Sequence, residues 1–257
     1  MKFSESDFNQ GYEKSASYYD LFASNDDIPF YKKYAKQQKS PILDLASGTG
    51  RVSIPLAEEG YEVVGLELSP AMLEVTKTKY ANLPEEVRKR LSFIQGSMTG
   101  FYLNQKFNLI IIPASFGHCL TTEQQLSCLS CVSEHLTTTG KFILDLYPGG
   151  TLKEKGSFTD NPVSIDGKYV ITRSGTYTTD FIKQMQYLKL KFQIHEENRL
   201  IEEIEVDSEV AVIFNREINL LLRIAGFRII EEYSNWEKVP YEPSSICDRR
   251  ILVLSKI

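Results

Sequence analysis

The sequence predicts an α/β protein with a parallel sheet covered by helices on both faces, followed late in the chain by antiparallel strands. Between residues 41 and 147, nearly continuous apolar runs alternate with segments of helical pattern, which is typical of a buried parallel sheet. Between about 159 and 214 the periodicity changes to two, as in LKLKFQIH, which indicates an antiparallel sheet with one solvated face. A helical pattern and two strand patterns follow. We therefore expect an antiparallel insertion near the end of an α/β domain.

The individual elements are predicted from apolar runs and from capping residues. The expected strands of the α/β domain cover 41–46, 61–68, 91–95, 107–114, 141–147, 227–234 and 248–257. Helices are expected over 51–60, 69–81, 121–136 and 216–225. Ser69 before Pro70, and Thr121 or Thr122, are helix-start signals. Gly60 and Gly226 are helix-end signals, and Gly140 lies beyond the end of the helix expected over 121–136.

The first 38 residues are helical in pattern and rich in aromatic side chains. These side chains are either the apolar faces of two short helices or part of a flap laid over a pocket. The predicted organisation is a helical flap over 1–38, an α/β domain over 39–158 and 215–257, and the insertion over 159–214, which forms a lid or a dimer surface.

Length and composition limit the function classes. A chain of 257 residues with 42% hydrophobic content can bury one substantial core. The net charge of −5 and pI near 5.4 give no general electrostatic attraction for nucleic acid or anionic lipid. The polar amino terminus does not resemble a signal peptide, and no apolar run approaches the roughly 18 residues that a membrane span needs, so we expect a cytoplasmic protein.

The four cysteines fit neither a disulfide framework nor a paired zinc spacing. They are Cys119, Cys128, Cys131 and Cys247, and three of them lie in or near a helical pattern. We interpret them as small core-facing thiols, and no metal site is expected.

The stretch ILDLASGTGR, at 42–51, places a loop with two glycines directly after a strand, and such loops approach ligands with bare backbone. A nucleoside-triphosphatase loop would need a lysine after Gly50, which is absent. A dinucleotide fingerprint would need glycine at position 53, which is Ser53, so an NAD-dependent oxidoreductase is disfavoured. Glu67, at the end of the second strand, can accept both hydroxyls of a ribose. Together with Asp44 before the loop, this favours an adenosylmethionine tail.

Five segments then carry a family resemblance. In this order and spacing, ILDLASGTGR, VVGLELSPAML, LSFIQGSMTGF, FNLIIIPASFGH and GKFILDLY resemble class I S-adenosylmethionine-dependent methyltransferases over about 41–147. The amino-terminal flap and the insertion are similar to the small-molecule branch, which includes N-methyltransferases of glycine and of amino sugars. The resemblance implies a Rossmann-like, doubly wound sheet of seven strands whose last strand is antiparallel. It also implies S-adenosyl-L-methionine as the methyl donor and S-adenosyl-L-homocysteine as the product.

The resemblance also assigns donor-binding roles by position. Gly48 and Gly50 would let backbone approach the methionyl part, Glu67 would bind the ribose, and Ser97 would meet the adenine in place of the acidic residue that many members carry there. The full set of expected donor-binding residues is Tyr12, Tyr19, Asp44, Ala46, Gly48, Gly50, Glu67, Leu68, Ser97, Met98 and Pro113.

His118, in SFGHCL just past the fourth predicted strand, is the candidate catalytic residue. Amino-sugar N-methyltransferases carry a similar Gly-His there, and a neutral imidazole could take a proton from an ammonium substrate or orient it. Its alternative role is that of a satisfied loop or core histidine. His135 and His195 have no such context and are interpreted as structural or surface residues.

The prediction is therefore a methyltransferase that transfers a methyl group in line to nitrogen or oxygen of a small molecule, as a monomer or homodimer. An RNA or protein methyltransferase stays open as an alternative and would need a basic strip, for which Lys183, Lys189 and Lys191 are the candidates. A non-catalytic donor-binding protein is a further alternative. Nucleic acid and membrane partners are not expected.

Overall fold

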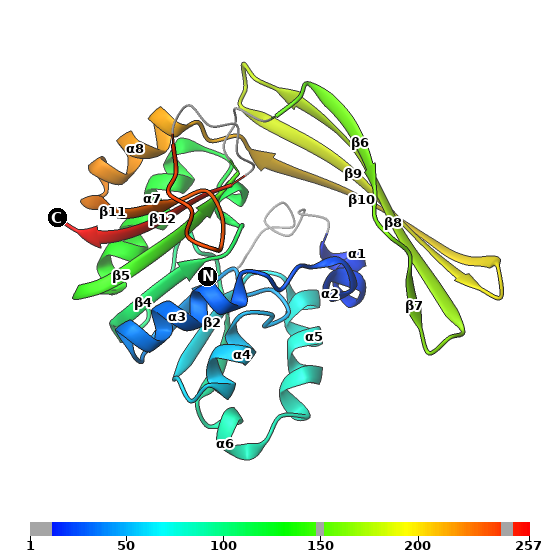
Figure 1. The fold of residues 1–257 in the computed structure, drawn as a ribbon, viewed down its shortest axis with the longest axis horizontal. Helices are drawn as coiled ribbons and strands as arrows, with labels where there is room; N and C mark the ends of the chain where they lie inside the picture. Colours follow the sequence, from blue (N-terminus) through cyan, green and yellow to red (C-terminus); the bar gives the residue numbers. More distant parts are fainter. Residues whose placement is uncertain (1–11, 148–151, 243–248) are drawn as a thin grey trace.

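A computed structural model describes residues 12–147, 152–242 and 249–257, and Figure 1 shows that they form a large sheet flanked by helices and a second, separate sheet. The large sheet has seven strands in the order β11-β12-β5-β4-β1-β2-β3. The strands are β1 (Ile42–Leu45), β2 (Val63–Glu67), β3 (Leu91–Gln95), β4 (Phe107–Ile112), β5 (Leu136–Leu146), β11 (Phe227–Tyr233) and β12 (Arg250–Lys256). Only β12 runs against its neighbours β5 and β11, so the predicted Rossmann-like sheet with an antiparallel last strand is confirmed.

Helices cover both faces of this sheet because successive strand residues point to opposite sides. In β4, Ile110 and Ile112 pack with α7 (Thr122–His135) and α8 (Asn215–Ile224). Leu109 and Ile111 pack instead with α3 (Ile28–Gln38) and α4 (Ser53–Glu58). The helices α5 (Pro70–Ala81) and α6 (Glu85–Arg88) connect β2 to β3. Two hydrophobic cores therefore hold the sheet rigidly between them.

The predicted helix starts agree with the structure, whereas one strand begins earlier than predicted. Ser69 caps α5 by accepting a hydrogen bond from the amide of Met72 at 3.1 Å, and Thr121 forms a reciprocal capping box with Gln124. Gly140 lies beyond the end of α7 at His135, as expected, but β5 already begins at Leu136 instead of at 141. Three consecutive threonines follow Leu136, and β-branched residues favour extended backbone, so β5 starts earlier than its apolar run indicates.

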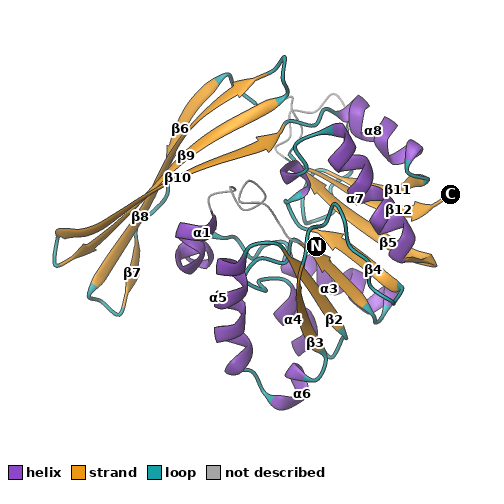
Figure 2. Cartoon of the chain, turned by 180° about the vertical axis from the view of Figure 1, so that it is seen from behind, coloured by secondary structure: helices purple, strands orange, loops and turns teal. Residues whose placement is uncertain are grey.

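The second sheet is antiparallel and corresponds to the predicted insertion. Its strands are β6 (Lys155–Thr159), β7 (Val163–Ile165), β8 (Tyr169–Asp180), β9 (Met185–Glu196) and β10 (Arg199–Ala211), in the order β10-β9-β8-β6 with β7 also paired to β8. The sheet therefore begins at Lys155, a few residues before the boundary expected at 159. Figure 2 shows it standing to one side of the large sheet, and β10 leads back into α8.

The described part of the amino-terminal segment divides into two pieces with different roles. The helix α3 packs in the core, where Tyr31 and Tyr34 are buried. The short turns α1 (Tyr12–Ser15), η2 (Ala16–Tyr18) and α2 (Tyr19–Phe22) lie instead between α5 and the second sheet, in contact with both. The helix α3 therefore fits the first interpretation, whereas the flap stays a prediction, and its residues 1–11 lie outside the described residues.

Two further expectations concern the thiols and membrane spans. Cys119 and Cys128 are buried free thiols in the core, Cys131 is half-buried, and Cys247 lies outside the described residues. Within the described ranges, none of the helices has the length and apolar character needed to cross a bilayer.

Candidate active site

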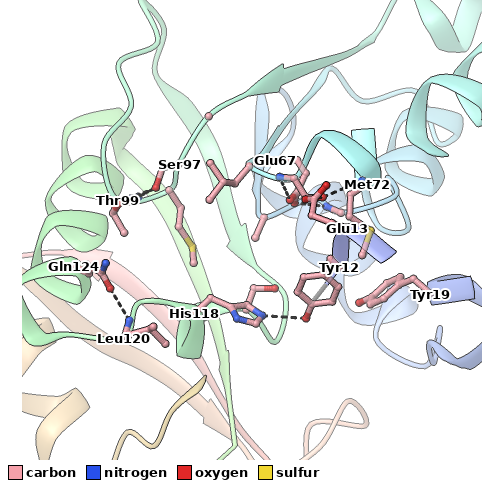
Figure 3. Close-up of a pocket in the computed structure, with 17 residues that line it drawn as sticks. Tyr12, Glu13, Tyr19, Glu67, Met72, Ser97, Thr99, His118, Leu120 and Gln124 are labelled. Carbon is pink, nitrogen blue, oxygen red and sulfur yellow. Dashed lines mark hydrogen bonds between the residues drawn. The ribbon is translucent and has the colours of Figure 1, made fainter. Parts of the chain in front are cut away.

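A cavity of about 180 Å³ opens where the carboxyl ends of β1, β2 and β3 meet α1 and the turn after β4 (Figure 3). Loops converge at this edge because parallel strands all end there. The predicted residues that line the cavity are Tyr12, Tyr19, Ala46, Gly48, Glu67, Leu68, Ser97, Met98 and His118. Sequence reasoning missed Glu13, Ser69, Met72, Gly96, Thr99, Ser115, Leu120 and Gln124, which also line it. Of these, Gly96 and Thr99 are neighbours of the predicted Ser97 and Met98 and could have been included on position alone.

Three of the predicted donor-binding residues do not line this cavity. Asp44 lies beneath the loop, where one carboxylate oxygen accepts a hydrogen bond from the hydroxyl of Ser53 at 2.6 Å. Gly50 has a φ of +78°, and a Cβ there would come within 3.1 Å of Phe93, so it shapes the turn. Pro113 is buried at the end of β4.

Gly48 presents bare backbone to the cavity. Its φ is +57°, and a Cβ built on it would meet no atom within 4 Å. The open space in front of this residue is therefore available to a ligand, and a side chain would occupy it. The preceding turn is tight, since the amide of Gly50 donates to the carbonyl of Ser47 at 2.9 Å.

Glu67 is fixed at the tip of β2 by two backbone amides. The amide of Gly48 donates to one carboxylate oxygen and the amide of Ser69 to the other, each at 2.8 Å. Burial raises the pKa of Glu67, the backbone amides oppose this, and the nearby carboxylate of Glu13 raises it further. Each oxygen keeps lone-pair capacity, so the carboxylate can also accept two hydroxyls of a diol.

The residues after β3 and at the start of α7 close the far end of the cavity. The hydroxyl of Ser97 accepts a hydrogen bond from the amide of Thr99 at 3.2 Å and shares another with the Thr99 hydroxyl at 2.8 Å. The side-chain carbonyl of Gln124 accepts from the amide of Leu120 at 2.7 Å. Among the described lining residues the carboxylates are Glu13 and Glu67, so this end is polar but uncharged.

His118 and Tyr12 meet across the cavity, as Figure 3 shows, with Tyr19 on the other side of Tyr12. The hydroxyl of Tyr12 lies 3.1 Å from Nε2 of His118, and which group donates depends on the imidazole tautomer. Desolvation lowers the pKa of His118 to about 4, and burial, aided by Tyr19 and Glu67, raises the pKa of Tyr12. At neutral pH the pair is therefore an uncharged imidazole and a protonated phenol, joined by one hydrogen bond.

A second cavity, of about 500 Å³, lies on the other side of this pair. Tyr12 and His118 line both cavities, so the pair stands at their junction. The floor of the second cavity includes Asp145 at the end of β5, which is bound by the guanidinium of Arg249. Burial raises the pKa of Asp145 to about 6, and Arg249 opposes the shift. No cluster of metal-ligating side chains occurs in the described ranges.

Comparison with known proteins identifies the domain that carries the first cavity. Residues 42–140 match the family model described as a methyltransferase domain. This segment is a methyltransferase domain. It contains the glycine loop, Glu67, Ser97 and His118, so most of the first cavity is built from it.

Individual relatives agree with this identification. The chain is 30% identical over 150 residues to the putative methyltransferase YqeM of Bacillus subtilis, covering 56% of this chain and 58% of the relative. It is 30% identical over 143 residues to the dTDP-3-amino-3,4,6-trideoxy-α-D-glucopyranose N,N-dimethyltransferase of Streptomyces venezuelae, covering 51% and 56%. The chain thus spans about half the length of the curated relatives it matches.

The similarity of fold extends further than the similarity of sequence. The CcbJ methyltransferase of Streptomyces caelestis superposes with a TM-score of 0.80 over 96% of this chain and 98% of that one, at 20% identity. This coverage includes the second sheet as well as the methyltransferase domain, which shows that both sheets belong to one known architecture.

Proposed function

We propose that the protein transfers a methyl group from S-adenosyl-L-methionine to an amine nitrogen of a small molecule. The observation that carries this proposal is the junction of two cavities at Tyr12 and His118, one cavity being formed by the glycine loop and Glu67 of a methyltransferase domain. The first cavity would hold the donor and is called the donor cavity below. The second would hold the methyl acceptor and is called the acceptor cavity.

The donor cavity fits an adenosylmethionine molecule residue by residue. The free space at Gly48 can take the methionyl part against bare backbone, and Glu67 can accept both ribose hydroxyls. Leu68, Met72 and Met98 supply apolar surface for the adenine, while Ser97 and Thr99 supply hydroxyls at its polar edge.

The bound donor supplies a methyl group already activated on a positively charged sulfur, so the protein has to position the acceptor in line with it. Such positioning can contribute roughly 7–11 kcal/mol of barrier reduction. The acceptor nitrogen needs a free lone pair, so an ammonium must lose a proton first. An imidazole with a pKa of about 4 is a poor sink for that proton, but its Nε2 can accept the hydroxyl proton of Tyr12 in a hydrogen bond. The phenol oxygen of Tyr12, held in this way by His118, can then accept an N–H bond and orient the neutral amine.

An amine rather than a hydroxyl is favoured by two considerations. An alcohol needs a base to become nucleophilic, whereas a neutral amine does not. Tyr12 and His118 at the junction are both uncharged, so they suit an amine better than an alcohol. The Streptomyces venezuelae relative is also named for methylation of an amino group.

The macromolecular alternative is less well supported by the charges on the second sheet. Lys189 lies 3.8 Å from Asp207, Lys191 lies 3.0 Å from Glu203 and from Glu205, and Lys183 lies 3.8 Å from Asp180. The candidate basic strip is therefore matched by carboxylates, which weakens the case for a phosphate backbone as ligand.

The test is calorimetric titration of the protein with S-adenosylmethionine, S-adenosylhomocysteine and NAD, followed by an acceptor screen that detects S-adenosylhomocysteine release. Micromolar binding of both adenosyl compounds is expected, with none for NAD. Glu67→Ala should abolish it, whereas Glu74→Ala, at an exposed position on α5, should not. Absence of adenosyl binding would refute the proposal, and tight donor binding without turnover on any amine would favour the non-catalytic alternative.

A further inference from the structure

Two neighbouring strands give the acceptor cavity a largely apolar wall. Leu188 and Leu190 on β9 and Val206 and Val210 on β10 line the cavity, and the polar Gln186 and Ser208 line it from the same face. The strand register pairs Leu190 directly with Val206, and alternate residues share one face of a sheet. The four apolar residues are called the β9–β10 wall. Lys189 and Asp207, which alternate with these residues along the strands, lie on the other face and are exposed.

The remaining boundary of the cavity is also largely apolar. Leu146, Leu152, Val212 and Ile213 contribute from β5 and from the segments that flank the second sheet. A ligand that displaces water from these surfaces gains free energy in proportion to its own apolar area.

The described lining residues include no lysine or arginine, and their one carboxylate belongs to Asp145. Arg249 donates hydrogen bonds to the carboxylate of Asp145 and, at 2.9 Å, to the hydroxyl of Tyr147. Asp145 is 1% exposed, and its other carboxylate oxygen has no hydrogen-bond partner among the described residues. The other polar groups that line the cavity are uncharged and include Ser15, Tyr147, Gln186 and Ser208, so the described lining offers no positive charge to an anion.

This chemistry separates the chain from its Streptomyces venezuelae relative, whose named substrate is linked to dTDP. A diphosphate carries negative charge that proteins match with arginine, lysine or clustered backbone amides. A wall of leucine and valine beside a carboxylate would desolvate that charge without compensating it, which is costly.

We propose, resting on the methyl transfer proposed above, that the acceptor is an amine carried on an apolar alkyl or aryl body and not a nucleotide-linked sugar. The nitrogen lies at Tyr12 and His118, and the apolar body lies on the β9–β10 wall. A cavity of about 500 Å³ is within the usual range for a small-molecule ligand.

The experiment measures kcat/KM by S-adenosylhomocysteine release for straight-chain primary amines from propylamine to octylamine. Each added methylene should raise kcat/KM about fourfold until the cavity is filled, as expected for burial of one CH₂ group. Thymidine diphosphate at millimolar concentration should not inhibit. A flat dependence on chain length, competitive inhibition by thymidine diphosphate, or a larger kcat/KM for a dTDP-linked amino sugar would overturn the inference.

A pair of variants tests the β9–β10 wall itself. Leu188→Asn should reduce the gain for each methylene, because it places an amide in the wall, whereas Lys189→Asn, one residue along and on the exposed face, should leave it unchanged. S-adenosylhomocysteine affinity is measured for all three proteins. If the unmodified protein does not bind S-adenosylhomocysteine, the methyl-transfer proposal is refuted. If donor binding is normal but both variants show the same gain in kcat/KM for each methylene, only the assignment of the β9–β10 wall is refuted.

Discussion

Replacing Tyr12 by phenylalanine isolates the hydroxyl that stands between the two cavities. The variant keeps the ring, which packs edge-on against His118 with centroids 5.6 Å apart and against Tyr19 at 6.0 Å. It removes only the oxygen that lies 3.1 Å from Nε2 of His118. The imidazole then loses the partner that holds its tautomer and orientation.

The expected loss follows from the cost of a buried polar atom without its partner, about 1–3 kcal/mol. If the loss falls on the transition state, kcat/KM drops about five- to 150-fold. The pH dependence should keep its shape. The pKa of His118 is about 4 and that of Tyr12 is raised, so neither group titrates between pH 5 and 9. The logarithm of kcat/KM should rise with pH until the acceptor ammonium itself is deprotonated, without an inflection near the ordinary histidine value.

The assay is kcat/KM from S-adenosylhomocysteine release across this pH range, with donor affinity measured separately by calorimetry. Tyr18→Phe is the matched control, because Tyr18 lies on the next turn, donates to exposed Glu202 at 3.4 Å and lines neither cavity. Equal activities of the two variants would refute the role given to Tyr12. An inflection near pH 6.5 in the unmodified protein, lost in His118→Gln, would show instead that His118 titrates as a base.

Three further changes, one of them with a control variant, test residues around the donor cavity. Burial raises the pKa of Asp44 to about 7 from an ordinary 3.8, so the folded state holds a proton that the unfolded state releases and stability falls as pH rises from about 4 to 7. We therefore expect the unfolding free energy of Asp44→Asn, measured by urea titration, to increase relative to that of the unmodified protein by about 2 kcal/mol between pH 5 and pH 8. If the unfolding free energies of the two proteins depend on pH in the same way, the reasoning is contradicted. Arg51→Met breaks a nearly buried, two-pronged pair with Asp27, with both contacts at 2.6 Å, and should cost about 3 kcal/mol in the same titration. Lys32→Met breaks an exposed pair and should cost less than about 1 kcal/mol, so equal losses would argue against the burial reasoning. Ser69→Ala removes the cap of α5 and the donor to Glu13 at 2.6 Å; it should lower stability by about 1 kcal/mol and weaken calorimetric donor binding, and unchanged affinity would exclude Glu13 from the site.

The sequence was sufficient to locate the edge of the sheet at which the site lies. Each of the first three strands is a short apolar run that ends at a turn or capping residue, so the sequence alone places Gly48, Glu67 and Ser97 next to one another. Such a prediction works because parallel strands end on the same side, which is a property of topology rather than of side-chain packing.

Contacts between elements distant in the chain could not be predicted in the same way. The partner of Asp44 is the hydroxyl of Ser53, and nothing in the pattern of either residue names the other. The same holds for Glu13, which lies beside Ser69 because α1 packs against α5. The early start of β5 at Leu136 coincides with its pairing with Phe107 of β4, a contact that the local apolar run beginning at Lys141 does not indicate.

The two cavities are formed by different parts of the chain, so different residues should determine donor binding and acceptor preference. Apart from Tyr12, Glu13 and Tyr19, the described lining of the donor cavity comes from the loops of the large sheet and the turns and helices that follow them, between Ala46 and Gln124. The acceptor cavity instead takes one wall from the second sheet, so substitutions in β9 and β10 can alter acceptor preference without touching the residues that surround the donor. Tyr12 and His118 are the only described residues common to both linings. A substitution at either residue should therefore change kcat/KM by a similar factor for every acceptor. A substitution in the β9–β10 wall should instead change the order of acceptors ranked by kcat/KM.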